Sequence, residues 1–508
     1  MTFIKERDLP WIIFFSVLLV YLGFLTKNYY WDGIYFAQLI ESAGSLDATL
    51  IHPNHPFYNP FGYVFYRLVQ LSGVEARAVT VLQVVNCMLS ASAAAVLFFV
   101  LRRCFRSVYL SVVLTFLFAF SATWWKFSTD ADSYIASILF LLVSFYLILP
   151  DGRPMPFAVA LTHTISMSFH QLAVFFFPVV IAGIYFQTSE LTRQERFRKI
   201  AEYAVTSFIA TFGIYYLSFY LQAGTLYFGE LVSWLTHFSP ENGFVFSIKE
   251  SLTHTFRGEL KLFFEGRFNF IKEIINPFTV LLSAVLAAAF VGLAVQIYGL
   301  WRDRKSELLP KATGFRQLTL LCLIWAGSYL IFLFFWIPKN TFYRMFYMPA
   351  FIILIGVLLA RYRVPEKRKW LMPLFVTVMT VSNFLFFIYP YSRVRKGTPL
   401  ELSLGMNNVW SRNSVIYYSI MESDNKMIRY FNPTTTWKPL VEMSVQELEN
   451  EIGDVYANGG DAWIETSALE QLSRDQSNAE WLKDHTDENA EFKLDDKAYK
   501  VTLIKILP

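Results

Sequence analysis

The sequence predicts a polytopic α-helical membrane protein that ends in a soluble α/β domain. Hydrophobic residues make up 55% of the 508 residues and charged residues only 17%, whereas soluble domains contain about 25% charged residues. The formal net charge of +4 conceals an asymmetry, because residues 391–508 hold 13 Lys and Arg against 19 Asp and Glu. Residues 1–390 are therefore basic and apolar, and the C-terminal part is acidic. Such a composition excludes a soluble globular enzyme, a disordered protein and a nucleic-acid binder.

Eleven apolar runs approach the ~20 residues that an α-helix needs to cross a bilayer. They cover roughly residues 10–26, 76–101, 108–125, 131–149, 155–169, 171–187, 201–222, 277–300, 317–336, 342–360 and 370–390. The fifth and sixth runs are short and nearly contiguous, so they form either two spans or one bent hairpin or broken helix. No cleavage site of small residues follows the first run, so we expect it to remain as a helix.

The distribution of basic residues predicts the orientation of these spans. Lys and Arg in short loops collect on the cytoplasmic side. With the N-terminus inside, the six inner segments hold 20 Lys and Arg, whereas the short outer connections carry only Lys126 and Lys339. We therefore expect a cytoplasmic N-terminus and three large pieces on the outer side, residues 27–75, 223–276 and 391–508.

Two of these outer pieces have an accessory character. Residues 391–508 read as a small α/β domain, with strands predicted at 414–419, 461–466 and 498–506, a helix-like stretch at 424–430, and a helix from Ser444 to about Tyr456. Glu447 follows Ser444 at the spacing of a capping box. This domain is either an accessory or docking module or a direct participant at the substrate. Residues 223–276 are typical of amphipathic interfacial helices, which serve as a lid or anchor or contribute to catalysis.

The first outer piece places an acid beside the membrane. Asp32 follows two tyrosines and a tryptophan and begins a helix-like run to Glu41. An acid at a helix start can simply cap the helix and complement its dipole. Alternatively, desolvation raises the pKa of such a carboxylate toward working pH, so that it acts as a general base on an acceptor hydroxyl. Glu41 would lie on the opposite helix face, which makes it a poor partner for Asp32.

A histidine–proline stretch follows in the same piece. Residues 52–60 read HPNHPFYNP, and their prolines predict a rigid, extended or turning segment. Its polar side chains, His52, His55 and Tyr58, suit hydrogen bonding to a substrate, although the segment can also be turn structure alone. Two histidines three residues apart also suit a metal, but no third ligand stands in register.

A second acidic feature lies at the outer start of the fourth span. Thr129 or Asp130 there can cap the helix. A further acid, Asp132, enters the hydrocarbon region, which is costly unless it lines a wet cavity, and such residues are functional by default. On physical grounds Asp132 is slightly the stronger candidate.

Three further polar residues lie at the same level of the membrane. His170 occupies the outer turn between the fifth and sixth spans, where a histidine either is solvated or binds substrate. Lys339 and Arg344 lie at the outer start of the tenth span, against the positive-inside bias. These two cations either clamp a phosphate or snorkel to lipid headgroups.

The order and sidedness of these motifs resemble the GT-C superfamily of polytopic glycosyltransferases, and within it the bacterial branch similar to protein O-mannosyltransferases. The resemblance covers the topology of residues 1–390. It rests on four motifs: Asp32-Gly33, then HPNHPFYNPFGY, then TDADSY at the fourth span, and NTFYRMFYMPAF in a late span. This chain departs from such relatives in one respect, because they often carry a glutamate soon after the first aspartate, where Gly33 to Phe36 stand here.

The resemblance implies a hexosyltransferase acting on the outer face of the bacterial inner membrane. Such enzymes move a sugar from a polyprenyl-phosphate carrier to a hydroxyl acceptor on a protein, lipid or polysaccharide. Asp32 matches the acid that acts as base, and Asp130 or Asp132 matches the acidic pair that positions acceptor or base. Lys339 or Arg344 would stand near the carrier phosphate. No cofactor follows with certainty, and a divalent metal stays open.

Two other classes of protein compete with this reading. A transporter or flippase of a lipid-linked or anionic solute would place charges and broken helices at the midplane, often in repeated halves. The sequence contains no such repeat, and its polar residues gather at the outer ends of spans. A non-catalytic scaffold would tolerate alanine at Asp32, His55 and Asp132.

Overall fold

The computed structural model divides the chain into two compact units. It describes residues 5–236, 243–265, 314–361, 369–394 and, with short gaps, 400–508; between 277 and 298 it describes isolated positions only. The eighth predicted span therefore lies largely outside the described residues. The first unit contains residues 1–26 and 39–390, and the second contains residues 27–38 and 391–508. Residues 27–38, which carry Asp32, thus group with the C-terminal part.

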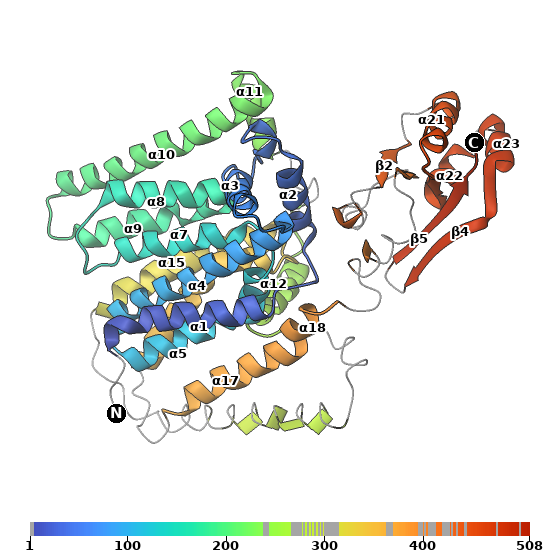
Figure 1. Cartoon of the computed structure of the whole chain (residues 1–508). Coiled ribbons are helices and arrows are strands. Elements are labelled where there is room, and N and C mark those ends of the chain that lie inside the picture. Colours follow the sequence, from blue (N-terminus) through green and yellow to red (C-terminus); the bar gives the residue numbers. More distant parts are fainter. Residues whose placement is uncertain are drawn as a thin grey trace. The chain divides into compact units, whose positions relative to one another are not determined.

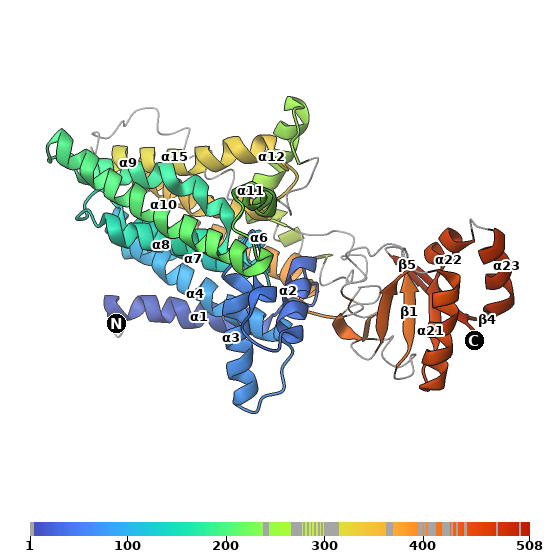
Figure 2. The same ribbon diagram turned by 90° about the horizontal axis from the view of Figure 1, so that it is seen from above.

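The first unit is a bundle of α-helices that lie side by side (Figures 1 and 2). Its long or apolar helices are α1 (Leu9–Gly23), α4 (Ala78–Phe105), α5 (Val108–Ala119), α7 (Tyr134–Leu147), α8 (Pro156–Phe169), α9 (Phe177–Gln187), α10 (Arg193–Ala223), α15 (Gly314–Phe335), α16 (Met348–Arg361) and α17 (Leu371–Asn383). Shorter helices connect them: α3 (Tyr58–Leu71), α6 (Ala122–Ser128), α11 (Phe228–Thr236), α12 (Ile248–Phe263), and the 3₁₀ segments η3 (Gln171–Phe176) and η4 (Phe342–Phe346). Each of the long helices overlaps a predicted apolar run, and α3, α11 and α12 lie in predicted outer pieces.

Helix α4 forms the centre of the bundle. It packs against α1, α5 and α7, and sixteen of its residues are buried, among them the polar Gln83, Asn86 and Ser90. Apolar side chains all around a helix are typical of a helix that is surrounded by others. The three buried polar side chains must therefore find partners inside the protein.

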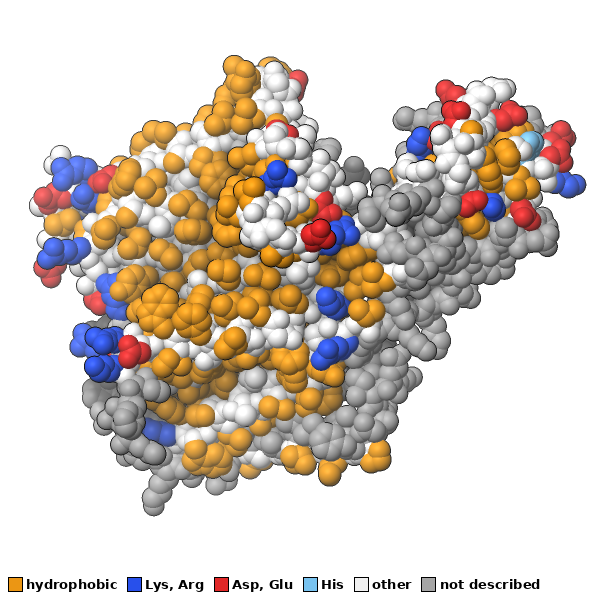
Figure 3. Space-filling view, in the orientation of Figure 1, with side chains coloured by type: hydrophobic (Ala, Val, Ile, Leu, Met, Phe, Trp, Pro, Cys, Tyr) orange, Lys and Arg blue, Asp and Glu red, His pale blue; other side chains and the backbone are white. Residues whose placement is uncertain are grey.

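Four helices in the described part of the chain are long and apolar enough to cross a membrane, namely α4, α10, α15 and the run Leu371–Tyr391. Helices α5 and α6 together make a fifth candidate, bent by 67° between them. The face shown in Figure 3 is covered with hydrophobic side chains over the middle of the first unit, while Lys and Arg gather at its left edge. Exposed side chains such as Leu19 (71%) and Phe208 (68%) contribute to this apolar surface, which suits a hydrocarbon surrounding.

The second unit contains a five-stranded sheet with the strand order β2-β1-β3-β5-β4. Its strands are β1 (Val415–Tyr418), β2 (Thr436–Pro439), β3 (Ala462–Glu465), β4 (Thr486–Asp496) and β5 (Tyr499–Ile506). Strand β1 pairs in parallel with β2 and β3, whereas β5 runs antiparallel to β3 and β4. Helix α21 (Val445–Ala457) packs Leu448 and Ile452 onto Val415 and Ile464 of the sheet. Helices α22 (Thr466–Leu472) and α23 (Gln476–His485) connect β3 to β4.

Several local predictions for this unit are confirmed. Strands β1, β3 and β5 occupy the three predicted ranges, and Ser444 and Glu447 form the predicted capping box at the start of α21. The predicted helix at 424–430 lies mostly outside the described residues. The sequence patterns missed β2, β4, α22 and α23. Strand β2 and the two brief helices carry little periodicity, and β4, although 11 residues long, is rich in Asp, Glu and Asn, which are depleted in strands.

Helix α2 (Trp31–Ser42) begins and ends as the sequence predicts, and its last turn fixes the start of α4. Glu41 accepts hydrogen bonds from Arg77 Nε (2.9 Å), Arg77 Nη2 (2.9 Å) and the backbone nitrogen of Ala78 (2.7 Å). It thus satisfies an otherwise unpaired amide at the N-terminus of α4.

Replacing Glu41 with Gln should lower the stability of the first unit. The neutral amide keeps one acceptor oxygen but loses the charge-assisted bonds to Arg77, a loss of roughly 1–3 kcal/mol. The thermal unfolding midpoint of the detergent-purified protein measures this change. Asp151→Asn is the control, because Asp151 is 59% exposed in its pair with Arg103 and such surface pairs contribute little. Equal midpoints for the two variants would contradict the role of Glu41.

Candidate functional site

The two aspartates lie in a short non-helical stretch between α6 and α7. Both are buried, and Asp130 forms an ion pair with Lys126 one turn earlier in α6. Asp130 Oδ1 accepts from the backbone nitrogen of Ala131 (2.8 Å), and Asp132 Oδ1 accepts from that of Ser133 (2.7 Å). The expectation that Thr129 or Asp130 caps α7 is wrong. The helix begins at Tyr134 without a side-chain cap, because the ion pair turns Asp130 toward α6.

Two amides from α4 hold this stretch in place. Asn86 Nδ2 donates to the carbonyl oxygens of Asp130 (2.8 Å) and Asp132 (2.7 Å), and Gln83 Nε2 donates to that of Thr129 (2.8 Å). Gln83 and Asn86 are three residues apart, so both project from one face of α4. The sequence patterns missed them, although two amides in an otherwise apolar helix are a usable signal.

Three histidines gather beside each other at this end of the bundle. The rings of His52 and His55 stack with centroids 4.0 Å apart, and the ring of His170 lies 5.8 Å from that of His55. All three side chains are buried, so the solvated alternative for His170 is excluded. Backbone amides donate to Nδ1 of His52 and of His170 (3.2 Å each), which leaves the proton of each neutral ring on Nε2.

Burial keeps His55 and His170 uncharged. It lowers the pKa of His170 to about 3, with a smaller contribution from His52, and it lowers the pKa of His55 well below the usual value. The neutral rings therefore offer hydrogen bonds rather than positive charge to a ligand.

The histidine–proline stretch docks on the junction between α8 and η3. The backbone nitrogen of Gln171 donates to the carbonyl of Asn54 (2.9 Å), and its side-chain amide donates to that of Pro53 (2.9 Å). The expected extended or turning conformation is wrong for residues 58–60, because α3 begins at Tyr58 and Pro60 fits its first turn, where a missing N–H costs nothing. Burial and the nearby charge of Asp132 raise the pKa of Tyr58, whose hydroxyl lies 3.4 Å from Asn86 Nδ2.

The late aromatic motif reaches the same place. The Tyr134 ring stacks on that of Phe342 with centroids 5.1 Å apart, and the His170 ring lies 5.2 Å from that of Phe346. Three of the four sequence motifs therefore lie together in the first unit. The fourth motif, Asp32 in the first turn of α2, belongs to the second unit. Burial of the Tyr35 ring, together with the nearby charge of Asp32, raises the pKa of Tyr35.

The two candidate cations both contact α12. Lys339 is 66% exposed and lies 3.2 Å from Glu250, whereas Arg344 is fully buried and donates to Glu259 at 2.8 Å. Burial raises the pKa of Glu259, and hydrogen bonds from Tyr347 and Arg344 partly offset this. The Arg344 side chain is thus held inside the protein by Glu259, where it reaches neither lipid headgroups nor an open phosphate-binding site. Glu259 and Tyr347 were not singled out from the sequence, since their pairing depends on how η4 packs against α12.

No cluster of three or more His, Cys, Asp or Glu suited to a metal occurs among the described residues. The two stacked histidines therefore gain no third protein ligand within that part of the chain.

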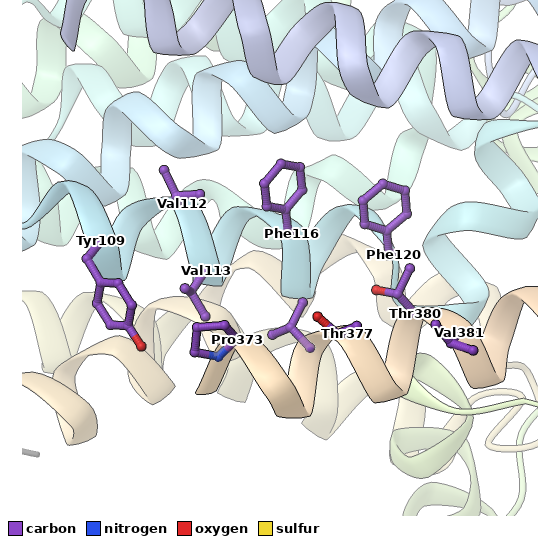
Figure 4. Close-up of a pocket in the computed structure, with 10 residues that line it drawn as sticks. Tyr109, Val112, Val113, Phe116, Phe120, Pro373, Thr377, Thr380 and Val381 are labelled. Atoms are coloured by element: carbon purple, nitrogen blue, oxygen red, sulfur yellow. The ribbon is translucent and has the colours of Figure 1, made fainter. Parts of the chain in front are cut away.

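An apolar groove of about 540 Å³ runs between α5 and α17. Figure 4 shows its lining side chains, from Tyr109 at one end to Phe120 and Val381 at the other. Helix α5 contributes Tyr109, Val112, Val113, Phe116 and Phe120, and α17 contributes Pro373, Val376, Thr377, Thr380 and Val381. The Phe120 ring lies 4.9 Å from that of Trp125, the neighbour of Lys126 in α6, so the groove ends beside the element that carries the ion pair.

Replacing one partner of the Lys126–Asp130 pair should destabilise the protein more than replacing both. Lys126→Met or Asp130→Asn alone leaves a buried charge without its partner, which destabilises by about 3–5 kcal/mol, whereas the double variant leaves none. We expect the double variant to unfold at a higher temperature in detergent than either single variant. If the stability losses of the two single variants added up to the loss of the double variant, the two charges would not be coupled.

No protein-family model matches the chain, and no curated protein matches its sequence. Among solved structures it is similar to ArnT from Cupriavidus metallidurans bound to undecaprenyl phosphate, with a TM-score of 0.62 and 10% identity over 98% of both chains. The apo state of the same ArnT gives a TM-score of 0.60 and 12% identity, again over 98% of both chains. An Archaeoglobus fulgidus oligosaccharyltransferase tethered with an acceptor peptide gives a TM-score of 0.45 and 10% identity, covering 91% of this chain and 69% of its own. The chain therefore has the fold of ArnT.

Proposed function

We propose that this protein is a glycosyltransferase that moves a sugar from a polyprenyl-phosphate carrier to a hydroxyl acceptor. The observation that carries the proposal is the convergence of three separate motifs, at His52, Asp130 and Phe342, at one end of a bundle with the ArnT fold. ArnT itself is described in complex with undecaprenyl phosphate, a carrier of this class. The resemblance to the O-mannosyltransferase-like branch makes a hexose the expected sugar.

The polar end of the bundle is proposed to face outward from the bacterial inner membrane. Along α4, nineteen residues separate Gln83, beside the aspartates, from Arg102 at the basic end, a rise of about 28 Å. This length matches the hydrocarbon thickness of a bilayer. With the basic end cytoplasmic, eleven spans put the N-terminus inside and residues 391–508 outside.

The chemistry proposed is a single displacement at the sugar carbon. Asp32 takes the proton of the acceptor hydroxyl as its oxygen attacks the anomeric carbon, and the bond from that carbon to the carrier phosphate breaks. The electron pair leaves with the phosphate, which Lys339 or Arg344 neutralises, and the configuration inverts. Asp130 and Asp132 position the acceptor or base, while His52, His55, His170 and Tyr58 hydrogen-bond the substrates. A divalent metal, if one takes part, would need ligands from the substrate, since His52 and His55 have no third protein ligand in the described part of the chain.

The groove between α5 and α17 is proposed to hold the hydrocarbon tail of the carrier. Its lining is apolar apart from the Tyr109 and threonine hydroxyls, and its end at Phe120 adjoins α6, which carries Lys126. A tail in this groove would leave the phosphate near the polar end of the bundle.

Replacing Asp32 with Asn tests the base. Removing a general base lowers the rate by about 10²–10⁴-fold, so the purified variant should insert and fold normally yet transfer almost no sugar from a panel of undecaprenyl-phosphate hexoses. Asp47→Asn is the matched control, because Asp47 is an exposed cap in the same outer piece. Undiminished transfer by Asp32→Asn would remove this residue from the mechanism. Mass spectrometry of glycans from a deletion strain identifies the acceptor class.

Replacing Thr377 with Trp tests the groove, because Thr377 is an exposed lining residue and the indole would fill the groove without entering the packed core. We expect KM to rise for a carrier with a full-length undecaprenyl chain and to stay constant for a short, water-soluble isoprenyl analogue. Leu19→Trp, on the exposed face of α1, should change neither value. Equal effects on both carriers would exclude the groove as the tail site.

A further inference from the structure

Helix α12 has two different faces. Ile248, Leu252, Phe256 and Leu260, each four residues apart, are all more than half exposed, while Gly258 on the other side is buried. An apolar stripe at this spacing on a helix that also carries charges is typical of a helix lying in the membrane interface. One face of α12 therefore suits contact with lipid, and the other contacts the protein.

The protein-facing side of α12 holds Arg344. Its Nη1 donates to Glu259 Oε1 (2.8 Å) and to the Tyr347 hydroxyl (3.0 Å), and that hydroxyl donates to the same Glu259 oxygen (2.5 Å). Nη2 donates to the carbonyl oxygen of Pro338 (2.9 Å). The exposed pair between Lys339 and Glu250 joins the same helix to the same loop. Both cations expected near a phosphate are thus occupied by carboxylates of α12.

The ion pair between Arg344 and Glu259 is incomplete. Arg344 Nε and Glu259 Oε2 are both buried without a hydrogen-bond partner among the described residues. A guanidinium pairs most strongly when Nε or a second Nη also donates to the anion. A phosphate has more acceptor oxygens than the single one that Glu259 offers, so it matches Arg344 better than its present partner does.

The approach of α12 to Arg344 depends on Gly258. A Cβ atom at this position would lie 2.3 Å from Arg344 Nε, far inside van der Waals contact. The last turn of the helix, just beyond Glu259, is tied down separately, because Thr123 donates to the carbonyl of Lys261 (2.9 Å) and Asn383 to that of Phe263 (2.8 Å). Arg344 can therefore be freed by a rotation of the Glu259 side chain and a tilt of α12 about this anchored turn.

We propose that α12 is a latch, in which Glu259 occupies Arg344 in the ligand-free protein and yields to the phosphate of the lipid-borne donor. Release of Glu259 lets α12 move away in the membrane interface and opens Arg344 to a ligand arriving from the lipid. Glu259 is thereby a positioning residue that sets how tightly the donor binds. This inference rests on the proposed function, because it takes the ligand to be a polyprenyl phosphate.

Two variants weaken the latch by different means. Glu259→Gln removes the competing charge, and Gly258→Ala pushes the helix from Arg344 while improving its helix propensity. Each should bind undecaprenyl phosphate about tenfold more tightly than the wild type, within the range typical of coupled sites. Glu202→Gln in α10 is the control, because its exposed pair with Lys199 involves neither candidate phosphate cation, and it should change affinity less than twofold. Unchanged or weaker binding by both variants, or an equal gain in the control, would refute the latch.

A second readout follows the movement of α12 directly, and its first comparison is made without ligand. The thiol introduced by Ser251→Cys lies on α12 where the serine is fully buried, so maleimide should label it slowly in the wild-type background and faster with Glu259→Gln. Undecaprenyl phosphate should also speed labelling in the wild-type background, whereas inorganic phosphate should not. Labelling that is insensitive to Glu259→Gln overturns the latch whatever the carrier is. Acceleration by Glu259→Gln without binding of undecaprenyl phosphate keeps the latch and overturns the carrier, and an equal response to inorganic phosphate overturns the lipid assignment.

Discussion

The candidate site depends on how a protein inside a membrane pairs a stretch of backbone that is not helical. The residues between α6 and α7 leave helical geometry among buried apolar helices, where no water satisfies their carbonyls. Asn86 and Gln83 supply the missing donors to the carbonyls of Asp130, Asp132 and Thr129. Because α4 packs against several helices, these two amides are held rigidly. The aspartates whose carbonyls they bind are held in place with them. The polarity of α4 at two positions thus fixes the place of the acids.

Two ion pairs, one buried and one partly buried, have different roles at this end of the bundle. The Lys126–Asp130 pair joins residues one helical turn apart in the chain, so α6 keeps it whatever other helices do. The Arg344–Glu259 pair joins η4 to α12 and can break only if one element moves. Burying either pair costs desolvation energy that apolar side chains would avoid. The local pair fits a fixed part of the site, and the long-range pair fits a part that changes with the ligand.

Features that depend on neighbouring residues were predictable from the sequence, and those that depend on distant contacts were not. The helix from Asp32 to Glu41 and the capping box at Ser444 follow from spacing alone. The apolar runs sufficed for the helical bundle, whereas the ring contacts of Phe342 with Tyr134 depend on how distant helices pack. Lys126, however, counted only as a loop cation, because its burial depends on the 67° bend between α5 and α6. In the sequence Glu259 resembles the other charges of an amphipathic helix, and only the folded structure shows that it pairs with Arg344.

One side chain connects the groove to the latch. Asn383, at the C-terminal end of α17, donates to the carbonyl of Phe120 (2.9 Å) at the end of the groove and to that of Phe263 (2.8 Å) at the end of α12. An amide that holds two helix ends with its two N–H groups cannot follow a shift in one without straining the bond to the other. A hydrocarbon tail that spreads α5 from α17 would therefore strain the hydrogen bond from Asn383 that anchors the C-terminal end of α12. On this geometry a lipid with both a tail and a phosphate acts on α12 from two sides, whereas a free phosphate acts from only one.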